Sequence, residues 1–520
     1  MKPSMSVRIF LSILVVTGAI NHPRSLYAQQ FDLLIRHGSV IDGSGSSAIN
    51  ADIGIRGDRI EFVGDGRGKT AKREIDAQGL IVAPGFIDPH THTLADLSNP
   101  ATSRNDAYLM QGVTTVVTGN DGSSPIEIGA TLAQWKKQGI GTNAALFIGQ
   151  GSVRRAVMGM SDATPTSQQI EKMQDLVARA MEQGAIGIST GLYYAPGSYS
   201  STEEVIALTK IAAEHGGIYD THMRDESSYS TGLLASVQET IRIGRETGIL
   251  VNISHIKALG RDVWGKSTDV IAMIDAARAS GVKVTANQYP YTASGTSVVA
   301  ALVPRWAEAD GKDAMLKRID DSTIRPKLIS EMTSNLERRG GAGAMLISSS
   351  KDKQIVGKTL EQIAQERKES PIDAALEIVK AGDAGVASFN MKESDIENFM
   401  RQDWVMTGSD GSEGHPRKYG TFPMKLRKYV FDEHIISLPF AIRSSTSLTA
   451  QTLGLKDRGL LKTGYYADIV VFDPKTINQR ATYENPTVLA TGVRYLTVNG
   501  ELAVDEGNLT SALAGRPLTH

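Results

Sequence analysis

The chain has 520 residues, no cysteine, and 55 lysines and arginines against 57 aspartates and glutamates, which gives a net charge of −2. This near-neutral composition argues against a nucleic-acid-binding protein, and the lack of cysteine excludes disulfides, thiol nucleophiles and thiolate metal sites. The length exceeds the ~250–300 residues at which a single core stops growing, so we expect a large catalytic domain with at least one accessory domain.

Residues 1–28 have the pattern of a secretory signal peptide. Lys2 and Arg8 precede an apolar run, Ile9–Ile20, and Ala28 ends a segment suited to cleavage. The run is shorter than the ~20 residues that a bilayer span requires. We therefore expect a periplasmic or secreted protein with no stable membrane span after cleavage. A retained N-terminal anchor is the alternative.

Both ends of the remaining chain predict short β-strands. Residues 31–63 alternate strand-like runs with turns, and residues 468–504 do the same, with a turn at Asn499-Gly500. Two such segments flanking a central domain most simply form one unit. We predict a small β-sandwich built from residues 29–80 and 455–520, around a central domain at 81–454.

The central domain alternates predicted strands with predicted helices. A first apolar run ends near Ile87, and later runs begin about 30 to 40 residues apart, at Val113–Thr118, Ala144–Ile148, Ala185–Ser189, Gly217–Asp220, Leu250–Ser254 and Val282–Ala286. Helix-like segments such as Gln168–Gln183 and Leu233–Thr247 separate them. With an eighth strand near Trp404–Met406, this pattern predicts an α/β fold, a closed (β/α)8 TIM-like barrel.

The interval before the eighth strand is much longer than the others. About 115 residues separate Ala286 from Trp404, and Arg305–Arg339 within them is rich in charged residues and helix formers. Long insertions of this kind usually form lids or separate modules. We predict an inserted lid subdomain at about 298–350. Strand-like runs also occur at Ala344–Ser348 and Gly385–Phe389. Either could be a barrel strand, so the numbers given to the last two barrel strands could be off by one.

Polar residues follow several predicted strands where each strand ends. In a (β/α)8 barrel, functional side chains collect at the carboxyl ends of the strands. The residues at these positions are His90 and His92 after the first strand, Asp121 after the second, His222 after the fifth, His255 after the sixth and Asp410 after the eighth. Imidazoles and carboxylates together suit zinc or a similar divalent cation. Because zinc lowers the pKa of water from ~15.7 to ~7, the set points to hydrolysis.

Several motifs resemble those of the N-acyl-D-amino-acid deacylases, or D-aminoacylases, of the metal-dependent amidohydrolase superfamily. They lie at residues 84–92 (PGFIDPHTH), 112–115 (GVTT), 221–224 (THMR), 254–257 (SHIK), 415–417 (HPR) and 420–423 (GTFP), and the resemblance runs from about Phe31 to Leu518. The HxH motif marks only the superfamily, whereas the last four segments in this order are more specific.

The resemblance implies an amidohydrolase that cleaves N-acyl-D-amino acids to a carboxylate and a free D-amino acid. It implies that His222 and His255 hold a tightly bound zinc, that His90 and His92 frame a second, weaker metal position, and that Asp410 is the general base.

The same resemblance implies that Lys257, Tyr291, Ser297 and Arg417 bind the substrate carboxylate. Arginine offers a carboxylate a bidentate fork and lysine a point charge, while the hydroxyls orient it.

Two features separate this chain from its apparent relatives. Asp121 stands where members of the family commonly carry cysteine, so the third zinc ligand would be a carboxylate, with weaker zinc selectivity and use of manganese or cobalt as an alternative. A side chain that caps the following turn is the other interpretation of Asp121. The fourth strand ends at Ile188–Gly191 without the lysine that cyclic-amide hydrolases carboxylate, which disfavours that activity.

Two alternative functions stay open at this point. One is a dipeptidase acting on peptides with a C-terminal D-residue, since the same carboxylate-binding residues would accept them. The other is a non-catalytic periplasmic binder of acylated amino acids. In each case the partner is a small molecule, and the sequence carries no signal for an oligomeric state.

Overall fold

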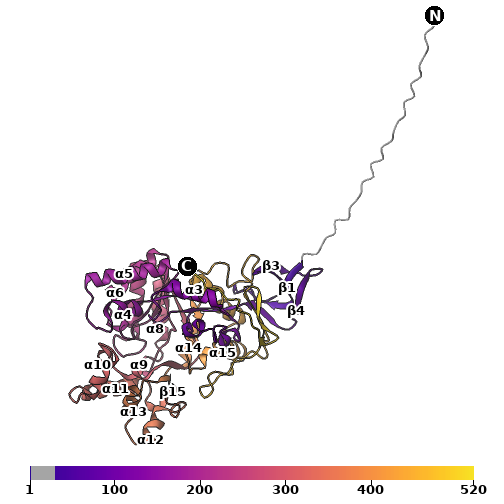
Figure 1. Cartoon of the computed structure of the whole chain (residues 1–520). Coiled ribbons are helices and arrows are strands. Elements are labelled where there is room, and N and C mark those ends of the chain that lie inside the picture. The colour runs from indigo at the N-terminus through magenta and orange to yellow at the C-terminus, as the bar shows by residue number, and fades with distance from the viewer. Residues whose placement is uncertain (2–29) are drawn as a thin grey trace.

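The computed structural model describes Met1 and residues 30–520, and the rest of the predicted signal peptide lies outside the described residues. Figure 1 shows a central barrel with a terminal sheet on one side, around β1, β3 and β4, and an inserted domain below, around α10 to α13. Within residues 30–520, no helix combines the length and the apolar character that a bilayer crossing needs.

The barrel consists of parallel strands that alternate with helices, so the predicted (β/α)8 fold is confirmed. Its strands are β6 (Phe86–Asp88), β7 (Val113–Thr118), β8 (Asn143–Leu146) with its continuation β9 (Ile148–Gly149), β10 (Gly187–Gly191), β11 (Ile218–His222), β12 (Leu250–Ile253), β13 (Val284–Gln288) and β17 (Val405–Thr407). Nearly all of these residues are buried on both faces, which explains their continuous apolar and β-branched sequences.

The hydrogen-bonded ladder of the barrel forms two arcs. One has the order β6-β7-β8 and the other β9-β10-β11-β12-β13-β17. The arcs meet at the carboxyl ends of β17 and β6, where the Asp410 amide donates to the His90 carbonyl (2.9 Å) and the His92 amide donates to the Gly411 carbonyl (3.1 Å). The closing contacts therefore lie beside the predicted site.

Helices pack around the outside of the barrel. They include α3 (Ile128–Gln138), α4 (Gln150–Met158), α5 (Ser167–Glu182), α6 (Thr202–Glu214), α7 (Leu233–Thr247), α8 (Ser267–Ala279), α14 (Glu393–Met400) and α16 (Leu438–Ser445). Among them, α5, α6 and α16 begin at a residue whose side chain caps the first turn. In α5, Thr166 and Gln169 form a reciprocal capping box, and Met173 and Val177 are buried on one face. The helix predicted at Gln168–Gln183 thus begins one residue earlier, at Ser167 directly after its cap, and ends one residue earlier, at Glu182.

The terminal sheet combines strands from both ends of the chain. From the N-terminal side come β1 (Gln30–Val40), β2 (Ile49–Arg56), β3 (Arg59–Gly64), β4 (Thr70–Asp76) and β5 (Ile81–Pro84), and from the C-terminal side β18 (Ile469–Phe472), β19 (Val493–Val498), β20 (Glu501–Asp505) and β21 (Asn508–Leu509). Antiparallel pairing of β5 with β18 joins the two sets, and Leu33, Ile53 and Ile469 share one core.

The boundaries of this unit differ from the predicted 29–80 and 455–520. The Pro84-Gly85 break divides an apolar run into β5, in the terminal sheet, and β6, in the barrel; a side chain at Gly85 would lie 2.2 Å from Thr114. At the other end, Leu518 donates its amide to the Ala144 carbonyl (2.8 Å), so the last residues lie along the barrel and not in the sheet.

The inserted domain is larger than the predicted range of 298–350. Its antiparallel sheet has the order β14-β16-β15, with β14 (Ala293–Ser297), β15 (Met345–Ser349) and β16 (Gly385–Phe389). Its helices are α9 (Val298–Leu302), α10 (Lys312–Asp320), α11 (Arg325–Arg338), α12 (Leu360–Arg367) and α13 (Pro371–Lys380). Because β14 and β16 pair directly, both strand-like runs in this interval belong to the insertion, and β17 is the eighth barrel strand.

Candidate metal centre and active site

The structure brings together all six residues predicted at the strand ends. Two groups have ligand atoms within 4.8 Å of one another, His90, His92, Asp121 and Asp410 in the first, and Asp121, His222 and His255 in the second. Asp121 is common to both groups. The carboxyl ends of five barrel strands thus supply one continuous ligand set.

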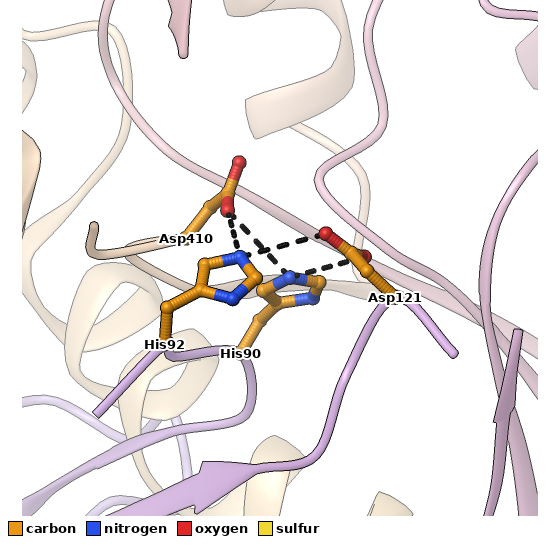
Figure 2. A group of neighbouring side chains, drawn as sticks. All are labelled: His90, His92, Asp121 and Asp410. Atoms are coloured by element: carbon orange, nitrogen blue, oxygen red, sulfur yellow. Dashed lines mark hydrogen bonds and ion pairs between the residues drawn. The ribbon is translucent and has the colours of Figure 1, made fainter. Parts of the chain in front are cut away.

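The first group is shown in Figure 2, where both imidazoles point toward the two carboxylates. His92 Nε2 lies 3.0 Å from Asp410 Oδ1 and 3.5 Å from Asp121 Oδ2. His90 Nε2 lies 3.4 Å from Asp121 Oδ1 and 3.6 Å from Asp410 Oδ1. Two carboxylates and two ring nitrogens therefore converge on one point.

The second group shares one oxygen of Asp121. Its Oδ1 lies 3.8 Å from His222 Nδ1 and 3.4 Å from His255 Nε2, in addition to its approach to His90. Its Oδ2 faces His92. Asp121 is therefore the carboxylate that both ligand groups would share if each held a cation.

Buried polar atoms in this site are left without hydrogen bonds by the protein. Both ring nitrogens of His90, Oδ1 of Asp121 and Nδ1 of His222 have no hydrogen-bond partner among the described residues. Such atoms cost about 1–3 kcal/mol each when they stay unsatisfied. The two carboxylates also carry negative charge that a divalent cation balances, and imidazole and carboxylate are ligands that such a cation accepts, so the donor set fits it.

The electrostatics of the site favour positive charge at its centre. Burial opposes ionisation of Asp121 and Asp410, but the surrounding imidazoles and, at Asp410, Arg417 outweigh burial and hold both pKa values well below the ordinary one. Burial likewise opposes the charged form of His92, yet the two carboxylates raise its pKa to about 10.

Three of the site residues have left-handed backbone conformations. Asp121, His255 and Asp410 have φ values of 54°, 35° and 49°. Such conformations cost about 1–3 kcal/mol in non-glycine residues and concentrate at functional sites. Hydrogen bonds hold two of them, since the His255 amide donates to Asn287 Oδ1 (2.8 Å) and the Asp410 amide donates to the His90 carbonyl (2.9 Å).

A buried carboxylate that we did not predict lies behind the histidines. Glu226 Oε1 is 3.0 Å from His255 Nδ1 and accepts a hydrogen bond from Lys257 Nζ at 2.6 Å. A carboxylate on the outer ring nitrogen orients the inner nitrogen toward the site. Glu226 follows His222 at the i+4 position of the THMRDE segment, and this spacing is the signal that could have identified it.

The metal-ligand groups line a cavity of about 460 Å³ at the mouth of the barrel, and Lys257, Ser297 and Arg417 also line it. Arg417 Nη1 lies 2.8 Å from Asp410 Oδ2, an ion pair that the sequence did not predict. The Ser297 hydroxyl accepts a hydrogen bond from the Ala300 amide (3.2 Å) and so caps α9.

Tyr291 is not placed as predicted. Its hydroxyl donates to Gln479 Oε1 (2.7 Å), and the residue does not line the cavity. Tyr289 lines the cavity instead, with a buried hydroxyl that has no hydrogen-bond partner among the described residues. Tyr289 directly follows β13, the position from which barrel residues reach the site, whereas Tyr291 lies two residues further on, where the chain has turned away.

Comparisons with known proteins agree with this arrangement. Residues 73–504 match the amidohydrolase family. A D-aminoacylase from Alcaligenes xylosoxydans xylosoxydans is 37% identical over 94% of this chain and 98% of its own. A solved D-aminoacylase with a binuclear metal centre has a TM-score of 0.82 and 36% identity, over 94% and 100% of the two chains. The N-acyl-D-glutamate deacylase of Bordetella bronchiseptica, solved with zinc and a phosphonate inhibitor, has a TM-score of 0.81 and 30% identity, over 95% and 100%.

Proposed function

Because the chain belongs to the amidohydrolase family, we propose that it is a metal-dependent deacylase that cleaves the amide bond of N-acyl-D-amino acids to a carboxylate and a free D-amino acid. The observation that carries the proposal is the pair of ligand groups joined at Asp121, with Asp410 beside them in a cavity lined by cationic side chains. The relatives are deacylases, and neither the dipeptidase nor the non-catalytic binder has a comparable observation in its favour.

His90, His92, Asp121, His222 and His255 would hold the metal, with Asp410 beside it. When bound, a divalent cation would lower the pKa of water and polarise the amide carbonyl. We propose zinc as the resident ion, tightly held by Asp121, His222 and His255, with a second, weaker divalent ion between His90 and His92.

Asp410 would carry the proton through the reaction. Its ionised Oδ1 points into the ligand set, 3.0 Å from His92 Nε2, and can accept the proton of the attacking water. When the amide bond breaks, the same carboxyl group returns the proton to the departing nitrogen. The ion pair with Arg417 keeps Asp410 ionised between turnovers.

The α-carboxylate of the substrate would bind at the cationic wall of the cavity. Arg417 and Lys257 supply charge, and Ser297 and the free hydroxyl of Tyr289 supply orienting hydrogen bonds. Tyr289 takes the role that the sequence resemblance assigned to Tyr291. We further propose that the protein acts in the periplasm or outside the cell, on the basis of the signal-peptide pattern at 1–28.

The test is release of free amino acid from paired N-acetyl-D- and N-acetyl-L-amino acids by the protein reconstituted with zinc. We expect amine release from the D-substrates and at least a ~100-fold lower kcat/KM on the L-substrates, since a three-point arrangement of metal, carboxylate site and side-chain pocket discriminates the two hands. Turnover of dipeptides in preference to acetylated amino acids would favour the peptidase, and binding without amine release would favour the non-catalytic binder.

A further inference from the structure

Arg339 is a buried cation in the wall of the active-site cavity. It follows α11 in the inserted domain, is only 2% exposed, and lines the same cavity as the metal-ligand groups. Its guanidinium donates to the Ala301 carbonyl (3.2 Å), Ser388 Oγ (3.2 Å) and the Tyr193 hydroxyl (3.3 Å). All three acceptors are neutral, and no carboxylate among the described residues forms an ion pair with Arg339.

Three other buried cations at or near the barrel mouth have acidic partners. Lys257 is paired with Glu226 at 2.6 Å, Arg417 with Asp410 at 2.8 Å, and Arg154 with Glu204. Buried arginines are rarely found without such a partner, because desolvation of the charge costs several kcal/mol. Arg155 also lines the cavity without an acidic partner, but it is exposed to water and does not bear this cost.

Arg339 is connected to the candidate metal site through Tyr193. Tyr193, whose hydroxyl accepts from Arg339, stacks on the imidazole of His222, with ring centroids 5.6 Å apart and 21° between planes. The guanidinium therefore lies about one tyrosine ring away from a predicted metal ligand. Arg417, by contrast, contacts Asp410 directly through an ion pair. The cavity thus offers two guanidinium groups, one beside the proton carrier and one beyond His222.

The lining of the cavity combines hydroxyl side chains with aromatic rings. Hydroxyl side chains contribute from the barrel and from the insertion, among them Ser123, Ser152 and Ser348. Among the lining residues that the structure describes, Leu259 and Val386 are the only aliphatic side chains larger than alanine or proline. The rings of Tyr193, Tyr194, Tyr229 and Tyr289 also line the cavity and add apolar surface, so its charged groups, and not a lack of apolar surface, distinguish it.

We propose that Arg339 binds a second carboxylate of the substrate, so that the preferred substrates are dicarboxylates. The second carboxylate belongs either to the side chain of the D-amino acid or to the acyl group. This assignment rests on the proposed deacylase function. Arg339 would select the substrate, since its neutral partners leave N–H donors and a full charge for an incoming anion.

The experiment compares three substrates of the zinc-reconstituted protein: N-acetyl-D-glutamate, N-succinyl-D-leucine and N-acetyl-D-leucine. We expect the wild type to have its highest kcat/KM on one of the two dicarboxylates, and the choice between them locates the second carboxylate. Arg339→Met should lower that kcat/KM about 10- to 100-fold, the effect of a charge-assisted hydrogen bond, and change the value for N-acetyl-D-leucine less than about 3-fold.

Two further variants control for structural effects. Arg339→Lys keeps the charge but loses the planar fork, and should retain part of the preference. Arg338→Met removes the neighbouring arginine, which donates to Asn335 Oδ1 (2.9 Å) and does not line this cavity, and should leave the preference unchanged. An equal loss on all three substrates in Arg339→Met, or a wild-type preference for N-acetyl-D-leucine, would overturn the assignment.

Calorimetry measures binding of the same substrates independently of their hydrolysis. It therefore tests the Arg339 assignment separately from the proposed deacylase function. If the wild type binds a dicarboxylate and Arg339→Met does not, while no amine is released, the deacylase proposal fails and the Arg339 assignment stands. If amine is released with no dependence of substrate preference on Arg339, the deacylase proposal stands and the Arg339 assignment fails.

Discussion

Asp410 is held by contacts that suit a proton carrier. His92 and Arg417 flank its two oxygens at 3.0 and 2.8 Å, and its left-handed backbone is anchored by the His90 carbonyl. We expect Asp410→Asn to lower kcat about 10²- to 10⁴-fold, because the amide cannot accept a proton, while metal content stays close to that of the wild type. Steady-state kinetics with elemental analysis of the same samples measures both quantities.

Wild-type turnover in Asp410→Asn would remove this residue from the chemistry. Loss of metal together with activity would instead make Asp410 chiefly a ligand. As a matched control, Asp96→Asn removes a carboxylate that pairs with Lys418 (2.9 Å) outside the ligand set, and should affect kcat little.

We expect Asp121 to influence which cation the site prefers. Its oxygens face His90, His222 and His255 on one side and His92 on the other. We expect Asp121→Ala to lose bound metal and activity. Asp121→Cys should recover zinc binding with higher selectivity for zinc over manganese, because thiolate is the softer ligand. Competition between zinc and manganese, followed by elemental analysis, gives the selectivity. Full metal content in Asp121→Ala would contradict a ligand role.

At the residue scale, the sequence predicted the site residues that lie at strand ends or within recognisable motifs. His90, His92, Asp121 and Asp410 follow directly after buried strands, so their convergence could be predicted. Residues that act through tertiary packing could not be predicted in this way. Arg339 belongs to the long insertion, and its place in the wall depends on how α11 packs against α9 and β16.

One helix carries a buried lysine without an acidic partner among the described residues. Lys425 begins the π-helix η5 (Lys425–Asp432) and donates to Thr407 Oγ1 (2.7 Å) and Ser444 Oγ (3.0 Å). Burial opposes its charged form and lowers its pKa from 10.5 to about 7. Below pH 7 the folded protein therefore bears the full cost of a buried ammonium group, and this cost is relieved as the pH rises toward 10.5.

We expect Lys425→Met to be more thermostable than the wild type at pH 6, with an advantage that shrinks toward pH 9. Over this window the folded wild type sheds a proton that the unfolded chain retains, which is worth up to ~1.4 kcal/mol per pH unit. Differential scanning calorimetry from pH 6 to pH 9 measures the Tm difference. Lys428→Met, on the same helix but paired with Glu393 (2.6 Å), controls for loss of a lysine as such. A Tm difference independent of pH would refute the burial argument.

At the element scale, the spacing of apolar residues predicted the helices and strands of the barrel. The helix expected at Leu233–Thr247 and the strand at Val113–Thr118 have those bounds in the structure. The insertion was predicted too short at both ends. Its first strand, β14, reads ASGTS, a sequence with little β-propensity, and its last strand, β16, had the pattern of a barrel strand although it pairs with β14 and β15. Pairing between distant segments is the information that local patterns lack.

For the whole molecule, the metal ligands span the seam between the two arcs of the barrel. His90, His92 and Asp121 follow strands of the β6-β7-β8 arc, whereas His222 and His255 follow strands of the other arc. A cation bound to both sets would tie the arcs together. We expect a chelator to lower the Tm of the reconstituted protein by about 3 °C, since saturation at 100-fold above Kd is worth ~2.7 kcal/mol.

Asp121→Ala provides the comparison for this measurement. If the stabilisation comes from the shared site, the chelator should shift the Tm of this variant much less than that of the wild type. An equal shift in both proteins would place the stabilising ion elsewhere.

The insertion leaves the barrel after β13 and returns before β17, and its first and last strands, β14 and β16, lie side by side. It has its own apolar core, including Leu328, Met332 and Val386, yet it contributes Arg339 to the cavity. If Arg339 selects the substrate as proposed, the residues for bond cleavage and those for selectivity lie in separate segments of the chain. Exchange of residues 293–389 between relatives would then change the substrate selectivity and leave the ligand groups and Asp410 unchanged.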